Sequence, residues 1–366
     1  MEPTLASEIL SEQPSRGDDA ATARRRRDRP IAWWLLLCCA LVFAMVVLGG
    51  VTRLTGSGLS MVNWKPISGV LPPLNQAAWE REFEHYRQTP EYAYVNKGMS
   101  LAEFKGIFWF EFAHRFLGRL IGVVFLLPFL YFLLRRRIQA SLAPRLATMF
   151  VLGGLQGLLG WYMVKSGLVD NPHVSQYRLA AHLGLAVIIY AFMLWTALGI
   201  LRREESGVPR TRSGFETFTR ILIVAMFVVM MSGAFVAGLK AGFIHNTFPM
   251  MAGKLLPDGM WSMTPAYLNL FENATTVQFN HRLIAIATFL AIVVLWLGAP
   301  RFALTRPQRL WLHATGLVAV VQVALGISTL VLRVPIPLAA LHQAGAMALL
   351  TVLLCLAFES RSLSNA

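Results

Sequence analysis

Eight stretches of mainly apolar residues constrain this 366-residue chain more than any other feature. A helix needs about 20 such residues to cross the hydrocarbon core of a bilayer. The chain is 56% hydrophobic and only 14% charged, which excludes an ordinary water-facing surface. The sequence therefore predicts an all-α polytopic membrane protein. Its transmembrane helices are expected at 31–50, 107–134, 142–164, 179–201, 221–239, 277–299, 310–332 and 338–358.

Basic residues lie at the ends of these stretches and predict their orientation. The formal net charge of +14 would suggest a nucleic-acid partner if the chain were soluble. The arginine runs instead flank apolar stretches, at 24–29, 135–145, 202–220 and 301–309, all on the side of the N-terminus. Because basic residues are enriched in cytoplasmic connections, we expect both termini to be cytoplasmic. The expected partner is the lipid bilayer and not nucleic acid.

Pairs of similar segments indicate an internal repeat. They are Phe112-Ala113-His114-Arg115 with Phe279-Asn280-His281-Arg282, Gln156 and Gly160 with Gln322 and Gly326, Leu179 to His182 with Leu338 to His342, and Leu71-Pro72 with Leu256-Pro257. Each unit contains four apolar stretches, an even number, so both units enter the membrane in the same direction. The predicted architecture is eight transmembrane helices arranged as two pseudo-symmetric four-helix bundles.

The repeat also sets the expected divisions of the chain. They are a cytoplasmic tail at 1–30, an N-terminal bundle at 31–201 with a long outer loop at 52–106, a cytoplasmic linker at 202–220, a C-terminal bundle at 221–358 and a cytoplasmic tail at 359–366. The outer loop contains a helical-looking amphipathic stretch from Gln76 to Gln88. Because this loop lies over the first bundle, we expect it to act as a lid that excludes water.

Four histidines, His114, His182, His281 and His342, lie inside apolar stretches, each in the first turns of a helix that enters from the outer side. An ionisable side chain inside a membrane is costly and marks a functional site by default. Each half contributes two histidines at similar depth. Two facing imidazoles are what a six-coordinate haem iron needs, so all four are predicted iron ligands. The residues four positions on are small, which leaves room for a flat ring: Gly118, Ala186, Ala285 and Ala346.

Other interpretations of the histidines remain open at this point. They could instead hydrogen-bond between helices, a common role of polar residues in membranes. Zinc is disfavoured, because each site offers two imidazoles and lacks the third protein ligand that catalytic zinc usually has. The remaining histidines are expected to be structural or solvated, with His245 the candidate exception because its loop lies over the second bundle. They are His85, His173, His245 and His313.

Glu111 breaks the symmetry between the halves. It stands three residues before His114, whereas Gln278 holds the same position before His281. A carboxylate can accept a proton or stabilise positive charge beside a haem edge, and a carboxamide does both less well. Glu111 is therefore the predicted catalytic residue. The structural alternative is an ion pair between Glu111 and Arg115 or Arg119.

Arg115 and Arg282 directly follow two of the histidines and lie near the membrane surface. Cations at this position could hold haem propionates, so both residues are predicted to bind the cofactor. The alternative is that their side chains snorkel to the lipid headgroups.

A glycine-rich motif and several further residues carry a resemblance to a known family. They are Gly49 to Ser60, Trp64, Pro66, Gly69 to Pro73, Glu111 to Arg115, Gly118, Arg119, His182, His281 and His342. From about residue 30 onward, the chain resembles the haem A synthase family. Some members carry cysteine pairs in the outer loops. Here Cys38, Cys39 and Cys355 all lie in apolar stretches, so the chain is similar to the cysteine-free branch of proteobacteria and mitochondria.

This resemblance implies an enzyme that oxidises the C8 methyl group of haem O to a formyl group, making haem A for cytochrome oxidase. It implies a permanent haem b on His281 and His342, a haem O site bordered by His114 and His182, and a catalytic role for Glu111. It also makes haem O synthase, an unidentified electron acceptor and a second copy of this chain candidate partners. The expected location is the inner membrane of a bacterium.

Two other functions remain as alternatives. A bis-histidine di-haem membrane cytochrome, which passes electrons to or from quinone, would explain the four histidines but not the difference between Glu111 and Gln278. A transporter built from parallel repeats would need ionisable residues near the middle of the bilayer. The candidate residues of this chain cluster near one surface instead.

Overall fold

The computed structural model describes residues 16–64, 68–168, 174–202 and 214–361. Parts of the expected tails at 1–30 and 359–366 and of the linker at 202–220 therefore lie outside the described residues, as do Pro66 and His173. The described residues form helices joined by turns and loops, with one isolated β-bridge between Met251 and Lys254. The all-α prediction is confirmed.

Eight long helices match the eight predicted stretches, and each is long and apolar enough to cross a membrane. They are α1 (Arg16–Leu54), α4 (Leu101–Leu134), α5 (Ala143–Gly167), α6 (Gln176–Leu201), α7 (Gly214–Gly238), α8 (Ala274–Gly298), α9 (Arg306–Val331) and α10 (Ile336–Ser360). The short elements are α2 (Gln76–Arg87) and α3 (Pro90–Tyr94), with single 3-10 turns at Ser68–Val70, Ala241–Phe243, Ala266–Leu270 and Ala299–Arg301. The amphipathic stretch expected from Gln76 to Gln88 is confirmed as α2.

A polar cap makes α4 longer than its apolar core. At the start of α4, the Ser100 side chain accepts a hydrogen bond from the Glu103 backbone N–H, and the Glu103 carboxylate accepts one from the Ser100 N–H. This capping box satisfies backbone donors that the first turn leaves free. The helix therefore begins at Leu101, before the predicted start at 107. Likewise α7 begins at Gly214, inside the segment expected to be linker.

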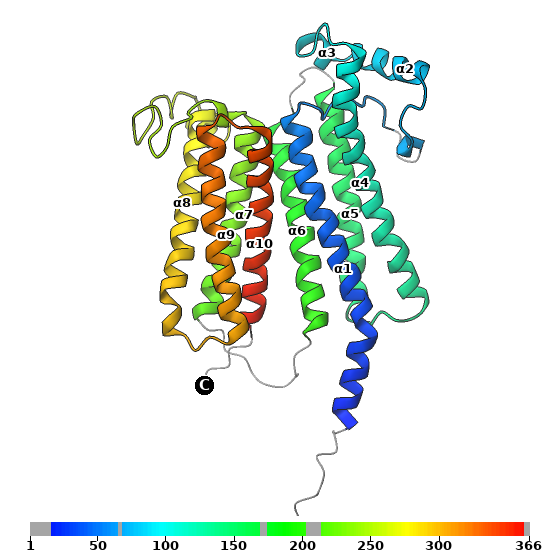
Figure 1. Cartoon of the computed structure of the whole chain (residues 1–366), viewed down its shortest axis with the longest axis vertical. Coiled ribbons are helices and arrows are strands. Elements are labelled where there is room, and N and C mark those ends of the chain that lie inside the picture. The colour runs from blue at the N-terminus through cyan, green and yellow to red at the C-terminus, as the bar shows by residue number, and fades with distance from the viewer. Residues whose placement is uncertain (1–15, 65–67, 169–173, 203–213, 362–366) are drawn as a thin grey trace, which may run out of the picture.

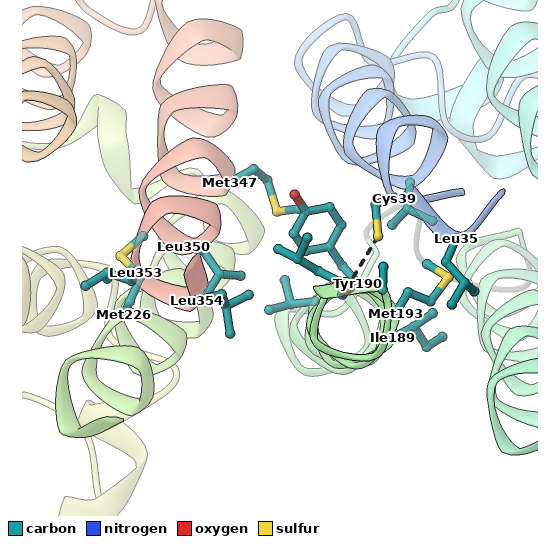
Figure 2. Packing of buried hydrophobic residues seen from close by; sticks show 14 of the residues in the cluster. Leu35, Cys39, Ile189, Tyr190, Met193, Met226, Met347, Leu350, Leu353 and Leu354 are labelled. Atoms are coloured by element: carbon teal, nitrogen blue, oxygen red, sulfur yellow. Dashed lines mark hydrogen bonds between the residues drawn. The ribbon is translucent and has the colours of Figure 1, made fainter. Parts of the chain in front are cut away.

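The eight long helices lie in two groups (Figure 1). Helices α1, α4, α5 and α6 form one group and α7 to α10 form the other, with α1, α6, α7 and α10 in contact across the boundary. One continuous buried apolar core runs through both groups. Figure 2 shows Tyr190 of α6 between Met347 of α10 and Cys39 of α1. The Tyr190 hydroxyl also hydrogen-bonds Thr351 of α10 over 2.7 Å, so the groups are joined by polar as well as apolar contacts.

The long outer loop packs onto the top of α4. Helices α2 and α3 lie beyond the outer end of the first group (Figure 1). A second buried cluster joins this loop to α4, and it consists of Trp79, Tyr86, Phe104, Phe108 and Phe112. Aromatic pairs within it lie at centroid distances such as 4.9 Å between Trp79 and Phe108. Large buried aromatic surfaces dominate packing energies, so the loop is fixed as a folded cap on the first group.

Candidate functional site

Each of the four predicted histidine ligands leans against a glycine of the preceding long helix. Any larger residue would crowd these contacts, because its Cβ would lie closer to the imidazole Cε1 than most real contacts allow. The distances from that added Cβ to Cε1 are 2.9 Å for Gly49 and His114, 3.0 Å for Gly160 and His182, 3.3 Å for Gly233 and His281, and 2.8 Å for Gly326 and His342. Each of the four imidazoles thus packs directly against the backbone of a neighbouring helix.

These glycines place the histidines at similar depth. Gly49, Gly233 and Gly326 each lie five residues before the outer end of their helix, and Gly160 lies seven before. At about 1.5 Å of rise per residue, the four positions fall within a narrow layer. The expectation that every histidine lies in the first turns of its helix is wrong for His114. Because α4 extends into the loop that caps the first group, His114 is its fourteenth residue.

The histidines are paired within each group. His114 lies within electrostatic range of His182, and His281 lies within range of His342. Gln156 on α5 donates a hydrogen bond to the backbone oxygen of His182 at 3.0 Å, and Gln322 on α9 donates to that of His342 at the same distance. The two groups therefore build matching surroundings for their second histidine.

The polar contacts of the rings differ between the two groups, since Gln156 Nε2 lies 3.4 Å from His182 Nε2 in the first group. His281 Nδ1 hydrogen-bonds Ser232 Oγ over 2.8 Å, and His342 Nδ1 lies 3.1 Å from Gln322 Nε2. An imidazole held at Nδ1 is oriented to present Nε2 to a metal. In the first group, His114 Nδ1 and His182 Nδ1 are buried and have no hydrogen-bond partner among the described residues. Buried polar atoms are normally paired, so each of these two nitrogens remains available to a further hydrogen-bond partner.

Glu111 lies fully inside the protein, 3% exposed, and is held by three donors. Its Oε1 forms an ion pair with Arg115 at 2.5 Å, while Oε2 accepts hydrogen bonds from Ser60 Oγ and the Met61 N–H, both at 2.7 Å. The ion-pair partner anticipated as the structural alternative is thus present. A carboxylate offers about four acceptor positions, so one position on Oε1 remains for a further donor.

The Ser60 contact explains why the glycine-rich motif and Glu111 occur together. The motif ends α1 and turns back across the outer end of the first group, where Leu59 packs against Gly167 of α5. Gly56 in this turn has φ +64, a conformation that favours glycine. The turn directs the Ser60 hydroxyl and the Met61 N–H at the Glu111 carboxylate.

The second group repeats this frame with different chemistry. Gln278 Nε2 donates a hydrogen bond to the His245 backbone oxygen at 3.0 Å, and Arg282 donates to the same oxygen at 2.7 Å. The position occupied by a charged acceptor in the first group is therefore occupied by a neutral donor in the second. His245 contributes its backbone to this frame, and burial lowers the pKa of its ring.

Both predicted propionate ligands hold outer loops. Arg115 donates to the backbone oxygens of Met61 and Asn63, at 2.7 and 3.2 Å. Arg282 donates to those of His245 and Thr247, at 2.7 and 2.8 Å. Propionate binding by either residue stays a prediction. Arg282 Nε is nevertheless buried and has no hydrogen-bond partner among the described residues, so one donor is still available.

The sequence reasoning missed Arg178, which stands one turn before His182 on the same face of α6. Its guanidinium lies 5.5 Å from the ring centre of Tyr162, and its Nη1 is buried without a partner among the described residues. Its spacing of four residues from a predicted ligand was the available signal. The other histidines have local roles: His85 contacts Asn63 and His313 accepts from Trp296.

Comparisons with known proteins show which family this chain resembles. The family described as COX15-CtaA, cytochrome oxidase assembly protein, matches residues 32–354. A Heme A synthase of Nitrosospira multiformis is 53% identical over 324 residues, which cover 88% of this chain and 91% of that protein. One of Nitrosomonas eutropha is 53% identical over 317 residues, covering 86% and 89%. Heme A synthase COX15 of Arabidopsis thaliana is 46% identical over 327 residues, covering 87% and 71%. The chain belongs to the COX15-CtaA family of cytochrome oxidase assembly proteins.

Proposed function

We propose that this chain is a haem A synthase that oxidises the C8 methyl group of haem O to a formyl group at the outer end of its N-terminal bundle. Its relatives are named for this activity and match most of the chain. Haem O is the substrate, and the N-terminal bundle at 31–201 is its site, between His114 and His182. The C-terminal bundle at 221–358 holds a resident haem b on His281 and His342.

The difference between Glu111 and Gln278 carries this assignment. Both lie three residues before a histidine, beneath an arginine that binds an outer loop, yet of the two only Glu111 offers a charged acceptor, since the unpaired Oε1 of Gln278 belongs to a neutral amide. A symmetric electron carrier has no use for such a difference, whereas an enzyme that acts on one of two haems needs it. The N-terminal bundle is therefore the reactive one.

The packing of the two bundles supports the same assignment. A Cβ added at Gly122 or Gly153 would meet no heavy atom of another described residue within 4 Å. Gly153 lies on the same face of α5 as the buried Met149. Counted along the sequence from His281, the residue that matches Gly122 is Phe289, which packs against the core. Counted from Gln322, the residue that matches Gly153 is Ala319, which is 1% exposed. Gly122 and Gly153 are both exposed, so α4 and α5 present an open face where the second bundle is packed. Haem O carries a farnesyl tail that haem b lacks, and this open face suits the tail.

The role of Glu111 follows from its contacts. Arg115, Ser60 and the Met61 N–H fix the carboxylate in one orientation, so it needs no reorganisation when charge develops beside it. Its free acceptor position can take a proton from the C8 methyl group or from the water that supplies the new oxygen. The lid formed by α2, α3 and Met61 closes the site toward the outer solution and keeps the carboxylate away from bulk water.

The C-terminal bundle prepares a place for the resident group. A bound haem b supplies a one-electron carrier. Ser232 and Gln322 orient the two imidazoles, while Gly233 and Gly326 keep the space beside them open. His281 and His342 are the residues that would hold its iron, and the free Nε of Arg282 is the donor for a propionate.

The proposed orientation places α2 and α3 outside the inner membrane of a bacterium and both termini in the cytoplasm. The arginine-rich connection at 135–137 lies at the opposite end of the molecule from α2 and α3 (Figure 1). The first described residues of α1 and the last of α10 lie at that same end. This distribution follows the positive-inside rule.

Exchanging the two matched residues tests the proposal. Glu111→Gln gives the first bundle the side chain of the second, so haem A should fall at least about 100-fold relative to haem O, as expected for loss of a general base. Haem b should remain. The control is Gln278→Glu, which should leave haem A formation intact. Haems extracted from the purified variants and separated by chromatography give the answer, and normal haem A in Glu111→Gln would refute the role of this bundle.

A further inference from the structure

Glu91 is a buried carboxyl group that the proposed mechanism has not used. It lies in α3, within the outer lid, and is 7% exposed. Pro90 at the first helical position and the Thr89 cap fix this short helix, so Glu91 is directed inward by its position in the first turn. Carboxyl groups are seldom buried outside the membrane core without a charged partner, because they lose hydration.

One oxygen of Glu91 has a partner and the other does not. Glu91 hydrogen-bonds the hydroxyl of Tyr86, a residue of α2 that is 0% exposed. That hydroxyl already accepts a hydrogen bond from Asn96 Nδ2 at 2.7 Å, so its own proton is directed at Glu91. Glu91 Oε2 is buried and has no hydrogen-bond partner among the described residues. The group is therefore positioned to gain or lose a proton at Oε2.

Two charged groups of other helices act on Glu91. Glu111 of α4 and Lys240, at the end of α7, both lie within electrostatic range of it. Lys240 is exposed, whereas Glu111 is buried. Glu91 is thus within electrostatic range of both the proposed reactive carboxylate and an exposed cation of the other bundle.

We propose that Glu91 relays protons from Glu111 to the outer solution beside Lys240, an inference that rests on the proposed function of the first bundle. Oxidation of a methyl group to a formyl group with oxygen from water releases protons and electrons in equal number. The electrons go to the acceptor of that reaction. The protons must cross the lid, since Trp79, Tyr86, Phe104, Phe108 and Phe112 close it with aromatic surface.

The proton balance of the relay is simple. The Glu91 carboxylate accepts a proton from the Glu111 carboxyl, which regenerates the Glu111 carboxylate for the next proton. The neutral Glu91 then releases the proton to water beside Lys240, whose positive charge favours the return of the Glu91 carboxylate. Burial first, and then the negative charge of Glu111, raise the pKa of Glu91 from 4.5 to about 8. A group with this pKa exchanges protons readily near neutral pH.

The test uses purified, haem b-loaded protein supplied with haem O, with conversion measured across about two pH units on either side of the Glu91 pKa. The wild-type rate should rise as Glu91 deprotonates. Glu91→Gln keeps the shape of the side chain and its hydrogen bond to Tyr86 but cannot carry a proton. The conversion rate of this variant should fall roughly 10-fold and should no longer rise with pH. Glu80→Gln, a change at an exposed carboxylate of the same lid, is the matched control and should retain both.

Infrared spectroscopy supplies a readout that is independent of conversion. A protonated-carboxyl band that disappears as the pH rises through about 8 should be present in the wild type and absent from Glu91→Gln. Tyr86→Phe removes the hydrogen bond to Glu91 but keeps the Glu91 carboxyl group. It therefore distinguishes a structural role of this contact from proton transfer by the carboxyl group. The proposal is overturned if Glu91→Gln converts haem O with the wild-type pH profile while Glu111→Gln is inactive. An active Glu111→Gln would instead refute the proposed function.

Discussion

At the residue scale, each of the four histidines packs against a glycine of the preceding long helix, so every contact joins two helices. Intramembrane histidines stand out in a sequence because an ionisable group in lipid is costly, so they could be predicted. Gly160 and Gly326 could be associated with them through the repeat. Gly49 and Gly233 could not, since glycine is frequent in membrane helices and only the packing shows which ones face an imidazole.

The contact at Gly326 gives a prediction for the resident haem. A Cβ there would lie 2.8 Å from His342 Cε1, so Gly326→Ala must displace the ring or the helix, at a cost of about 1–3 kcal/mol. We expect the purified variant to carry clearly less haem b per protein than the wild type, measured by its absorption spectrum and by extracted haem. Gly316→Ala on the same helix is the control, because its Cβ would meet Trp296 at an ordinary 3.7 Å. Full haem b in Gly326→Ala would show that the glycine is dispensable.

At the scale of elements, hydropathy predicts the membrane helices, but polar chemistry sets where they end. The cap at Ser100 adds turns to α4 that no apolar pattern indicates, and these turns carry Phe104 into the lid cluster. The same limitation applies to Glu111. Its spacing from His114 and its possible pairing with Arg115 could be predicted from helix geometry. Its contacts with Ser60 and Met61 could not, since they depend on how a loop of another element turns back.

The difference in packing between α4 and α8 predicts which bundle accepts the larger haem. Gly122→Phe introduces the residue that stands at the matching position of the second bundle, Phe289, into the open face of α4. The bulky ring should fill the room available to the farnesyl tail, so haem A should fall and haem O should accumulate while haem b stays unchanged. Gly122→Ala, which adds one methyl group to open space, should behave like the wild type. Unchanged haem A in Gly122→Phe would place the tail elsewhere.

At the scale of the whole molecule, the two bundles are joined by contacts that their sequences do not predict. The Arg53 side chain of α1 donates to the backbone oxygens of Ala237 and Gly238 at the end of α7. Gln343 of α10 donates to the Val46 oxygen of α1 at 2.8 Å, and the Tyr190 hydroxyl bonds Thr351. The repeat predicts two similar units, but not the face on which they meet, because these contacts join residues far apart in the chain. These hydrogen bonds join the two bundles that carry the histidine pairs.

A close backbone contact between α6 and α7 allows the importance of this interface to be measured. A Cβ at Gly238 of α7 would lie 2.6 Å from the Cα of Gln176 on α6, and a backbone atom cannot move aside as a side chain can. Gly238→Ala should therefore separate α6 from α7 and cost about 1–3 kcal/mol, which lowers the unfolding temperature by several degrees. Gly199→Ala is the matched control on α6, since its Cβ would meet no other described residue within 4 Å and alanine favours helix. We expect that control to unfold at or above the wild-type temperature. Equal thermal stability of the two variants would show that the bundles need no close contact at this point.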